Sequence, residues 1–296
     1  SCANAKGRGP VRGPGLFCCH HVNMLRAYRS VDHVVVRLLA AEPLYALFTE
    51  TFGLPVAWPL QRTDFATYGW VHIGNTDLEL WASHSNSDLP AYALPPLIHG
   101  FALEPALSLA ESLARVEEAG IACKPPRAFQ TQNAQGETVA NFTNSVLLDV
   151  SASSCCIFFC EWNPRSTIYP WPEAATPAQR RAQHRQDLEN RNGGPLGITG
   201  LTAIRMATPD KHLHQRLWCA LSGSQPSQSI ALAQDISLDL VPGEHLRVES
   251  LTLGVRSLRV ARAFLADHQL LQTDAGDLLT IAGKDLSIHL REASLP

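Results

Sequence analysis

One pattern of apolar and polar positions occurs four times along the chain. Each occurrence has a short run rich in β-branched or other apolar residues, then a turn, then an amphipathic helix of about three turns that usually ends at a glycine. Further strand-like runs follow each helix. The four units begin at residues 31, 99, 200 and 247 with the runs VDHVVVRL, HGFALE, GLTAIRM and RVESLTLGV. We therefore predict an α+β fold built from four repeated units.

A segment rich in proline and charge separates the second unit from the third. Within it, Thr176-Pro177 predicts the start of a polar helix and Asn192-Gly193 its end, so we expect an exposed connecting helix. The 296 residues suit two domains of ordinary size. We predict a flexible tail at 1–30, a first domain at 31–162, a linker at 163–197 and a second domain at 198–296. The polar run 124–138 is interpreted as a surface loop inserted in the second unit, and a loop that overhangs a pocket is the alternative.

The segment 68–81 predicts a β-hairpin with a two-residue turn at Gly74-Asn75. In this register, Val71 pairs with Leu78 and Trp70 with Glu79. Strand alternation then separates an apolar face from a face that combines aromatic, imidazole and carboxylate groups. The second face carries Tyr68, Trp70, His72, Asp77, Glu79 and Trp81. It suits the wall of a ligand cavity, and a solvated outer face is the alternative.

Composition narrows the class of protein. Lys and Arg number 24 against 27 Asp and Glu, and no basic block occurs, so nucleic acid is not expected as a partner. No apolar stretch approaches the roughly 18 residues that would cross a membrane. The eight cysteines include no paired CxxC motifs, which favours a reducing cytoplasm. We find no Gly-rich phosphate loop and no sequence context for a Ser or Cys nucleophile.

These residues resemble the vicinal-oxygen-chelate superfamily, which includes glyoxalase I, bleomycin resistance proteins and type I extradiol dioxygenases. The resemblance rests on DHVVVRL in the first unit, on LELW at 78–81 and on FFCEW at 158–162. It covers residues 31–292. It implies four βαβββ modules that form two glyoxalase-like domains, each an open cup of mixed sheet with helices outside. The second domain is interpreted as a degenerate partner, because its first strands contain no histidine.

The resemblance also implies site residues. A metal would be held by a first-strand histidine and a last-strand glutamate from each module, namely His33, Glu79, His99 and Glu161. Gly100, rather than His99, occupies the family's ligand position, so His99 would face the cup only if a β-bulge turned it. Glu161 is also the candidate catalytic group for proton transfer. The expected substrate-binding residues are Arg37, Tyr68, Trp70, His72 and Trp81.

We therefore expect a divalent-metal-dependent enzyme acting on a small molecule with two adjacent oxygens, by lyase, isomerase or dioxygenase chemistry. Zn, Ni, Mn, Fe and Co all suit a set of imidazoles and carboxylates. Extradiol dioxygenases also carry four modules in one chain, but their iron lies in the C-terminal pair, whereas the candidate ligands here are N-terminal. The alternative is a metal-free binding protein of the bleomycin-resistance type. Either would be a monomer or a homodimer.

Overall fold

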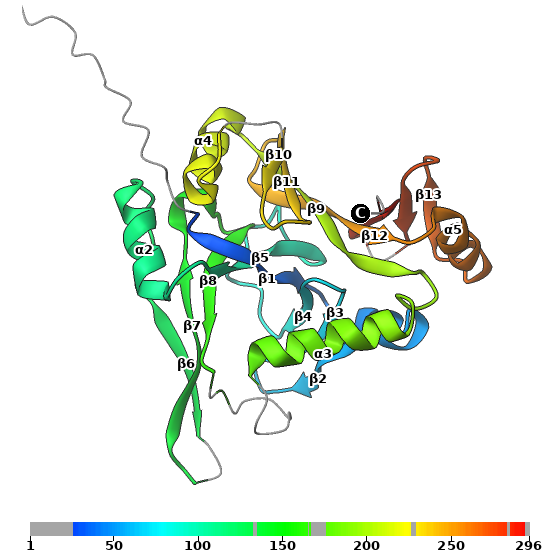
Figure 1. Cartoon of the computed structure of the whole chain (residues 1–296), viewed down its shortest axis with the longest axis horizontal. Helices are drawn as coiled ribbons and strands as arrows, with labels where there is room; N and C mark the ends of the chain where they lie inside the picture. The colour runs from blue at the N-terminus through cyan, green and yellow to red at the C-terminus, as the bar shows by residue number, and fades with distance from the viewer. Residues whose placement is uncertain are drawn as a thin grey trace, which may run out of the picture.

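A computed structural model gives the fold, and it describes residues 26–132, 135–164, 166, 176–225, 229–282 and 285–293 (Figure 1). Residues 1–25 of the predicted tail and residues 165 and 167–175 of the predicted linker lie outside these ranges. The tail is shorter than predicted, because the first strand begins at Tyr28. The fold is of the predicted α+β type, and its strands form one large mixed sheet.

The N-terminal half runs from strand β1 to strand β8. Its elements are β1 (Tyr28–Arg37), α1 (Glu42–Ala46), a π-helical turn (Leu47–Thr51), β2 (Val56–Arg62), β3 (Ala66–His72), β4 (Asp77–Ser83), β5 (Leu97–Pro105), α2 (Leu109–Glu118), β6 (Arg127–Gln132), β7 (Thr138–Val146), a 3-10 turn (Leu148–Val150) and β8 (Cys156–Trp162). The described residues of the run 124–138 are mostly exposed, as expected of a surface insertion, but the run is not a loop, because β6 and the start of β7 lie within it and pair with each other.

Helix α3 (Pro177–Asn190) connects the two halves. The C-terminal half contains β9 (Ile198–Thr208), α4 (Lys211–Ser222), β10 (Ser229–Ala231), β11 (Ser237–Pro242), β12 (Arg247–Val255), α5 (Leu258–Asp267), β13 (Leu271–Asp274), β14 (Leu279–Ile281) and β15 (Ser287–Glu292). No helix among the described residues has the length and apolar character needed to cross a membrane.

Strand pairing repeats along the sheet. Four strands that precede a helix each lie parallel to a later strand, in the pairs β1–β4, β5–β8, β9–β11 and β12–β15. The strands that precede helices also pair antiparallel, β1 with β5 and β9 with β12. A short antiparallel contact at Val248 and Ile98 joins β12 to β5. The sheet is therefore continuous across both halves (Figure 1).

The hairpin formed by β3 and β4 has the predicted register. Val71 pairs with Leu78 and Trp70 with Glu79, and the apolar face of the hairpin is fully buried. Its turn contacts the C-terminal half: Asn75 Nδ2 donates to the Leu201 carbonyl, and the Leu201 N–H donates to Asn75 Oδ1, both at 2.8 Å. Gly74 has a φ of +109°, and a Cβ there would lie 2.6 Å from the Thr199 carbonyl oxygen.

Helix α3 begins at Pro177, as predicted, but it is not wholly exposed. It lies against β2 and β3 (Figure 1). Arg180, His184 and Leu188 repeat every four residues and are buried on one stripe, while most of the other side chains face solvent. Two further contacts hold the helix in place. Arg181 donates to the Asp32 carboxylate, and Arg185 donates to the Gly74 carbonyl. The linker helix is thus part of the N-terminal half's packing.

Candidate functional site

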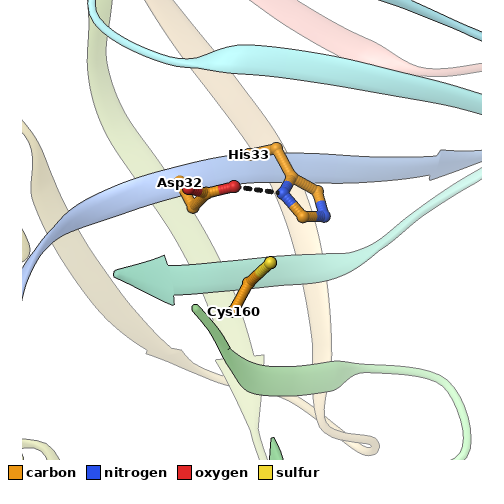
Figure 2. Close-up of side chains that lie close together, drawn as sticks. All are labelled: Asp32, His33 and Cys160. Carbon is orange, nitrogen blue, oxygen red and sulfur yellow. Dashed lines mark hydrogen bonds and ion pairs between the residues drawn. The ribbon is translucent and has the colours of Figure 1, made fainter. Parts of the chain in front are cut away.

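Two consecutive residues of β1, Asp32 and His33, are both buried on the face that carries the site. Alternation would normally send neighbours in a strand to opposite faces. The pairing of β1 with β5 shifts register between Val31 and His33, and this irregularity re-aims Asp32. Asp32 and His33 can therefore act as one unit, and their hydrogen bond is drawn in Figure 2.

The Asp32 carboxylate is fully engaged. Its Oδ1 accepts from His33 Nδ1 at 2.7 Å and from Trp162 Nε1 at 3.2 Å. Its Oδ2 accepts from Arg181 at 2.6 Å. Burial alone would raise the pKa of Asp32, but the Arg181 charge and the His33 hydrogen bond outweigh burial and hold that pKa well below its usual range. Asp32 is therefore a charged group that orients the His33 ring.

The second nitrogen of His33 faces a carboxylate. His33 Nε2 lies 3.6 Å from Glu79 Oε2, and Glu79 occupies the β4 position paired with Val35. Burial alone would lower the pKa of His33, but Asp32 and Glu79 outweigh it and raise that pKa. Burial raises the pKa of Glu79 despite the nearby imidazole. The structure thus brings together two of the four predicted metal ligands.

Cys160 of β8 lies beside Asp32 and His33 (Figure 2). One ligand atom from each of the three residues lies within 4.8 Å of the others. Burial raises the pKa of the Cys160 thiol well above its ordinary value. Sequence reasoning missed both Asp32 and Cys160. Alternation along FFCEW was the available signal for Cys160, since Phe158, Cys160 and Trp162 share one face and pack together.

The other two predicted ligands lie elsewhere. The Glu161 carboxylate accepts the Leu109 N–H at 2.8 Å, so it caps the first turn of α2. Glu292 at the end of β15 accepts from the Leu258 N–H of α5 in the same way. His99 sits at an irregularity in the pairing of β5 with β1, and its Nε2 donates to the Ser153 carbonyl. Neither Glu161 nor His99 belongs to a group of potential metal ligands in the described residues.

The predicted substrate-binding residues divide into three kinds. Arg37 is buried, and its guanidinium binds Asp88 and Asn86. His72 is also buried, and its Nδ1 lies 2.6 Å from Asp77 Oδ1. Tyr68, Trp70 and Trp81 belong to a continuous series of aromatic contacts. These contacts join Phe65, Trp81, Tyr68, Trp58, Trp70, Trp162, Phe142 and Phe129, with ring centroids 5.0–6.1 Å apart.

The His33 ring lies within this aromatic series. It is 4.4 Å from the Trp70 ring and 5.6 Å from the Phe158 ring, measured between centroids. A cavity of about 620 Å³ borders the series at Phe142 and Trp162, and Arg181 and Glu104 line its polar side. Apolar walls with a few charged groups are typical of small-molecule sites.

The C-terminal half differs from the N-terminal half in its potential metal ligands. A cavity of about 490 Å³ lies between the halves, and its lining includes Arg205, Arg247 and His289. Among the described residues of this half, no three His, Cys, Asp or Glu side chains gather closely enough to hold an ion. The groups with metal-ligand chemistry are therefore found in the N-terminal half and on α3.

No family model matches this sequence, and no curated protein is similar to it. Solved structures do match. The fold is similar to that of extradiol dioxygenases. An extradiol ring-cleaving dioxygenase from B. fuscum aligns with a TM-score of 0.58 and 10% identity, over 93% of this chain and 74% of that chain. A second match is homoprotocatechuate 2,3-dioxygenase from Brevibacterium fuscum in complex with 3,4-dihydroxyphenylacetate. It aligns with a TM-score of 0.54 and 10% identity, over 93% of this chain and 83% of that chain.

A hypothetical protein from Staphylococcus aureus matches over 89% of this chain and 99% of its own, with a TM-score of 0.55 and 8% identity. At these identities the likeness concerns the fold alone. The dioxygenase-like fold supplies the scaffold, and any function must be argued from the side chains that this chain places on it.

Proposed function

We propose that the protein is a divalent-metal-dependent enzyme that acts on a small molecule with two adjacent oxygens, and that His33 and Glu79 hold the ion. The observation that carries this proposal is the approach of His33 Nε2 to Glu79 Oε2 at 3.6 Å, with His33 Nδ1 held by Asp32. A carboxylate that fixes the distal nitrogen of a ligand histidine is the usual outer-shell arrangement of metal sites.

The donor set fits a borderline metal ion. Ligand atoms that share one ion at bonds of about 2.0–2.2 Å lie roughly 3 Å apart, so a small side-chain adjustment suffices here. Cys160, which groups with Asp32 and His33, would be the third donor, and its thiol would lose its proton on binding an ion. Imidazole, carboxylate and thiolate together favour Zn or Fe over Mg or Ca.

When bound, the ion would act as a Lewis acid toward the two substrate oxygens. This chain's own residues would bind and shield the substrate. Trp70 and Trp162 provide apolar walls beside His33, and Asp32 keeps the imidazole in one tautomer. The dihydroxyphenyl ligand in the complex of one structural neighbour is a molecule of this class. Lyase, isomerase and dioxygenase chemistry all remain within the proposal, and Glu161 has no part in it.

The module arrangement supports the same proposal. We infer four modules, namely β1–β4, β5–β8, β9–β11 and β12–β15, because each first strand lies parallel to the last strand of its own group. The third group is shorter, with two strands after α4 among the described residues. The described cysteines are free thiols, which favours a reducing compartment such as the cytoplasm.

Metal content measured by mass spectrometry tests the proposal. The wild type, reconstituted with Zn²⁺ or Fe²⁺, should lose one equivalent of metal on Glu79→Gln substitution. Glu161→Gln is the matched control, because it also replaces a strand carboxylate of the N-terminal half, and it should keep the ion. Oxygen consumption with catechols and Fe²⁺ then separates dioxygenase chemistry from the others. Retention of all metal by Glu79→Gln would contradict the assignment.

A metal-free binding protein is the second candidate, and a specific observation favours it. The structure brings together His33 and Glu79 but not His99 and Glu161, while the aromatic series offers an extended apolar surface. Quenching of tryptophan fluorescence by aromatic ligands in the presence of a chelator tests this function. Equal ligand affinity in the wild type and in Glu79→Gln, without metal, would favour the binding protein.

A further inference from the structure

A second group of potential metal ligands lies between the hairpin and the linker helix. His72 ends β3, Asp77 begins β4, and His184 comes from the middle of α3. The three residues are only 1%, 6% and 5% exposed. One ligand atom from each lies within 4.8 Å of the others. The cluster shares no side chain with the Asp32, His33 and Cys160 group.

His72 is prepared for metal binding by its partner. The carboxylate of Asp77 accepts from His72 Nδ1 at 2.6 Å, which leaves the proton on Nδ1 and a lone pair on Nε2. That Nε2 atom is buried and has no hydrogen-bond partner within the described part of the chain. A buried acceptor without a partner is unfavourable, and an ion at this point would satisfy it.

His184 faces the same place from the other side. Its ring centroid is 5.5 Å from that of His72. His184 is buried, and it would bind an ion as a neutral imidazole through a nitrogen lone pair. Two neutral imidazoles beside a carboxylate form a common zinc-binding set.

We propose that His72, Asp77 and His184 bind a divalent transition-metal ion such as Zn²⁺, which fastens α3 to the β3–β4 hairpin. His72 Nε2 and an imidazole nitrogen of His184 supply the neutral ligands, and Asp77, which binds His72 Nδ1, supplies the negative charge as an outer-shell partner. Ligand atoms around tetrahedral zinc lie about 3.3 Å apart, whereas those of the three residues lie within 4.8 Å of one another, so the closure needed is at most about 1.5 Å. The hydrogen bonds of Arg185 to Gly74 and of Arg191 to Gly53 already hold the helix near that position.

This site is independent of the proposed enzyme function. His33 and Asp77 are paired in the register of β1 and β4, but the first group consists of Asp32, His33 and Cys160, with Glu79 next to His33 Nε2. Zinc titration should therefore be made in the Glu79→Gln background, where only the second site would remain. Metal content by mass spectrometry and the visible spectrum of the Co²⁺-loaded protein provide two readouts that do not depend on activity.

We expect Glu79→Gln protein to bind one equivalent of Zn²⁺ and to gain thermal stability from it. Adding His184→Ala should weaken that binding by more than about 100-fold, because loss of a direct ligand exceeds the effect of losing an outer-shell partner. His212→Ala, which removes an exposed histidine from α4, is the matched control and should change nothing. Hydrogen exchange of α3 amides should slow on zinc addition only where His184 is present.

Asp77→Asn provides a second test that keeps the side-chain shape, and it should weaken zinc binding by about 10–100-fold, as expected for loss of an outer-shell partner. Circular dichroism of each metal-free variant confirms that it is folded before its metal content is compared. Absence of zinc from folded Glu79→Gln protein would overturn the proposal. Zinc retained by both His184→Ala and Asp77→Asn in that background would overturn it equally, because the ion would then lie elsewhere.

Discussion

Asp32 is the residue on which the candidate site depends most. It is buried, it holds the His33 ring, and it receives the guanidinium of Arg181 from α3. A buried ion pair adds little net stability compared with apolar residues, but removing one member is costly because the other is left without its partner. The site and the docking of the linker helix are therefore connected through one carboxylate.

Asp32→Asn should lower the free energy of unfolding by about 2 kcal/mol or more at pH 7, measured by urea denaturation. The effect should shrink as the pH falls. A carboxyl whose pKa is lowered by folding stabilises the protein above its unfolded pKa of about 3.9, and that stability is lost as the pH falls through the lower, folded pKa.

Asp88→Asn is the matched control, since Asp88 also binds an arginine, Arg37, but its side chain is 58% exposed. Its substitution should cost at most about 1 kcal/mol. Equal losses from the two substitutions would show that the Asp32 ion pair is not a buried, stability-determining contact.

Glu79→Gln, unlike Asp32→Asn, should stabilise the metal-free protein at high pH. Burial raises the pKa of Glu79, so its contribution to stability is complete below the unfolded pKa and is lost as the pH rises through the folded pKa. Glutamine cannot ionise. We therefore expect the variant to unfold a few degrees higher than the wild type at pH 8 in the presence of chelator, and at nearly the same temperature at pH 4. A lower melting temperature at pH 8 would contradict this sign.

The structure places two of the predicted ligands, His33 and Glu79, next to each other. The resemblance of DHVVVRL and LELW to family motifs predicts both residues, and each lies in a strand with a clear apolar face. The other two predicted ligands lie apart from this pair, because Glu161 accepts the Leu109 N–H and His99 lies where the pairing of β5 with β1 is irregular. A one-residue offset turns a strand side chain to the other face, and irregular pairing at β1 and β5 occurs where Asp32 and His99 lie. Nothing in the local sequence specifies such an irregularity.

At the scale of elements, the β3–β4 hairpin was predictable from the sequence. For α3, the start of the helix was predictable but its buried face was not. The Gly74-Asn75 turn and the alternating pattern fix the hairpin's register. The start of α3 follows from Thr176, which caps it with Gln179. The buried stripe of α3 consists of Arg180, His184 and Leu188, two of which are polar, so no apolar periodicity could reveal which face is covered.

The tight contact at the hairpin turn leads to a test at this scale. Gly74→Ala should destabilise the protein by at least about 2 kcal/mol, because its positive φ disfavours a side chain and the new Cβ would meet the Thr199 carbonyl. Gly276→Ala is the matched control: its φ is +86°, but nothing lies within 4 Å of a Cβ there, so only the backbone cost of about 1 kcal/mol applies. Similar losses, compared by thermal unfolding, would mean that the turn does not depend on close contact with β9.

At the scale of the whole molecule, the two halves share more than a linker. One apolar core contains residues from both, and the Phe52 and Phe264 rings meet across the boundary at 6.3 Å. The Asn75 side chain binds the backbone of Leu201, and the Ser154 hydroxyl donates to the Leu246 carbonyl. The repeat predicted the elements and their order, but it gave no information about contacts between halves, which depend on side chains from distant parts of the chain.

These contacts predict cooperative unfolding of both halves. Five of the six tryptophans precede residue 180, so fluorescence reports mainly on the first part of the chain, whereas far-UV circular dichroism reports on all of it. The two signals should give the same urea midpoint within error. Asn75→Ala should lower both midpoints together. Separate transitions for the two signals would show that the halves fold as independent domains.

The shared core has a consequence for the synthesis of the protein. Residues 26–164 leave the ribosome before β9 and α4 exist, yet Phe101 and Tyr28 pack against Trp218, and the Ala27 N–H donates to the Leu221 carbonyl. At translation rates of about 5–20 residues per second, this apolar surface stays uncovered for several seconds. The nascent chain thus offers a binding surface to ribosome-associated chaperones, and it loses that surface only when α4 has been made.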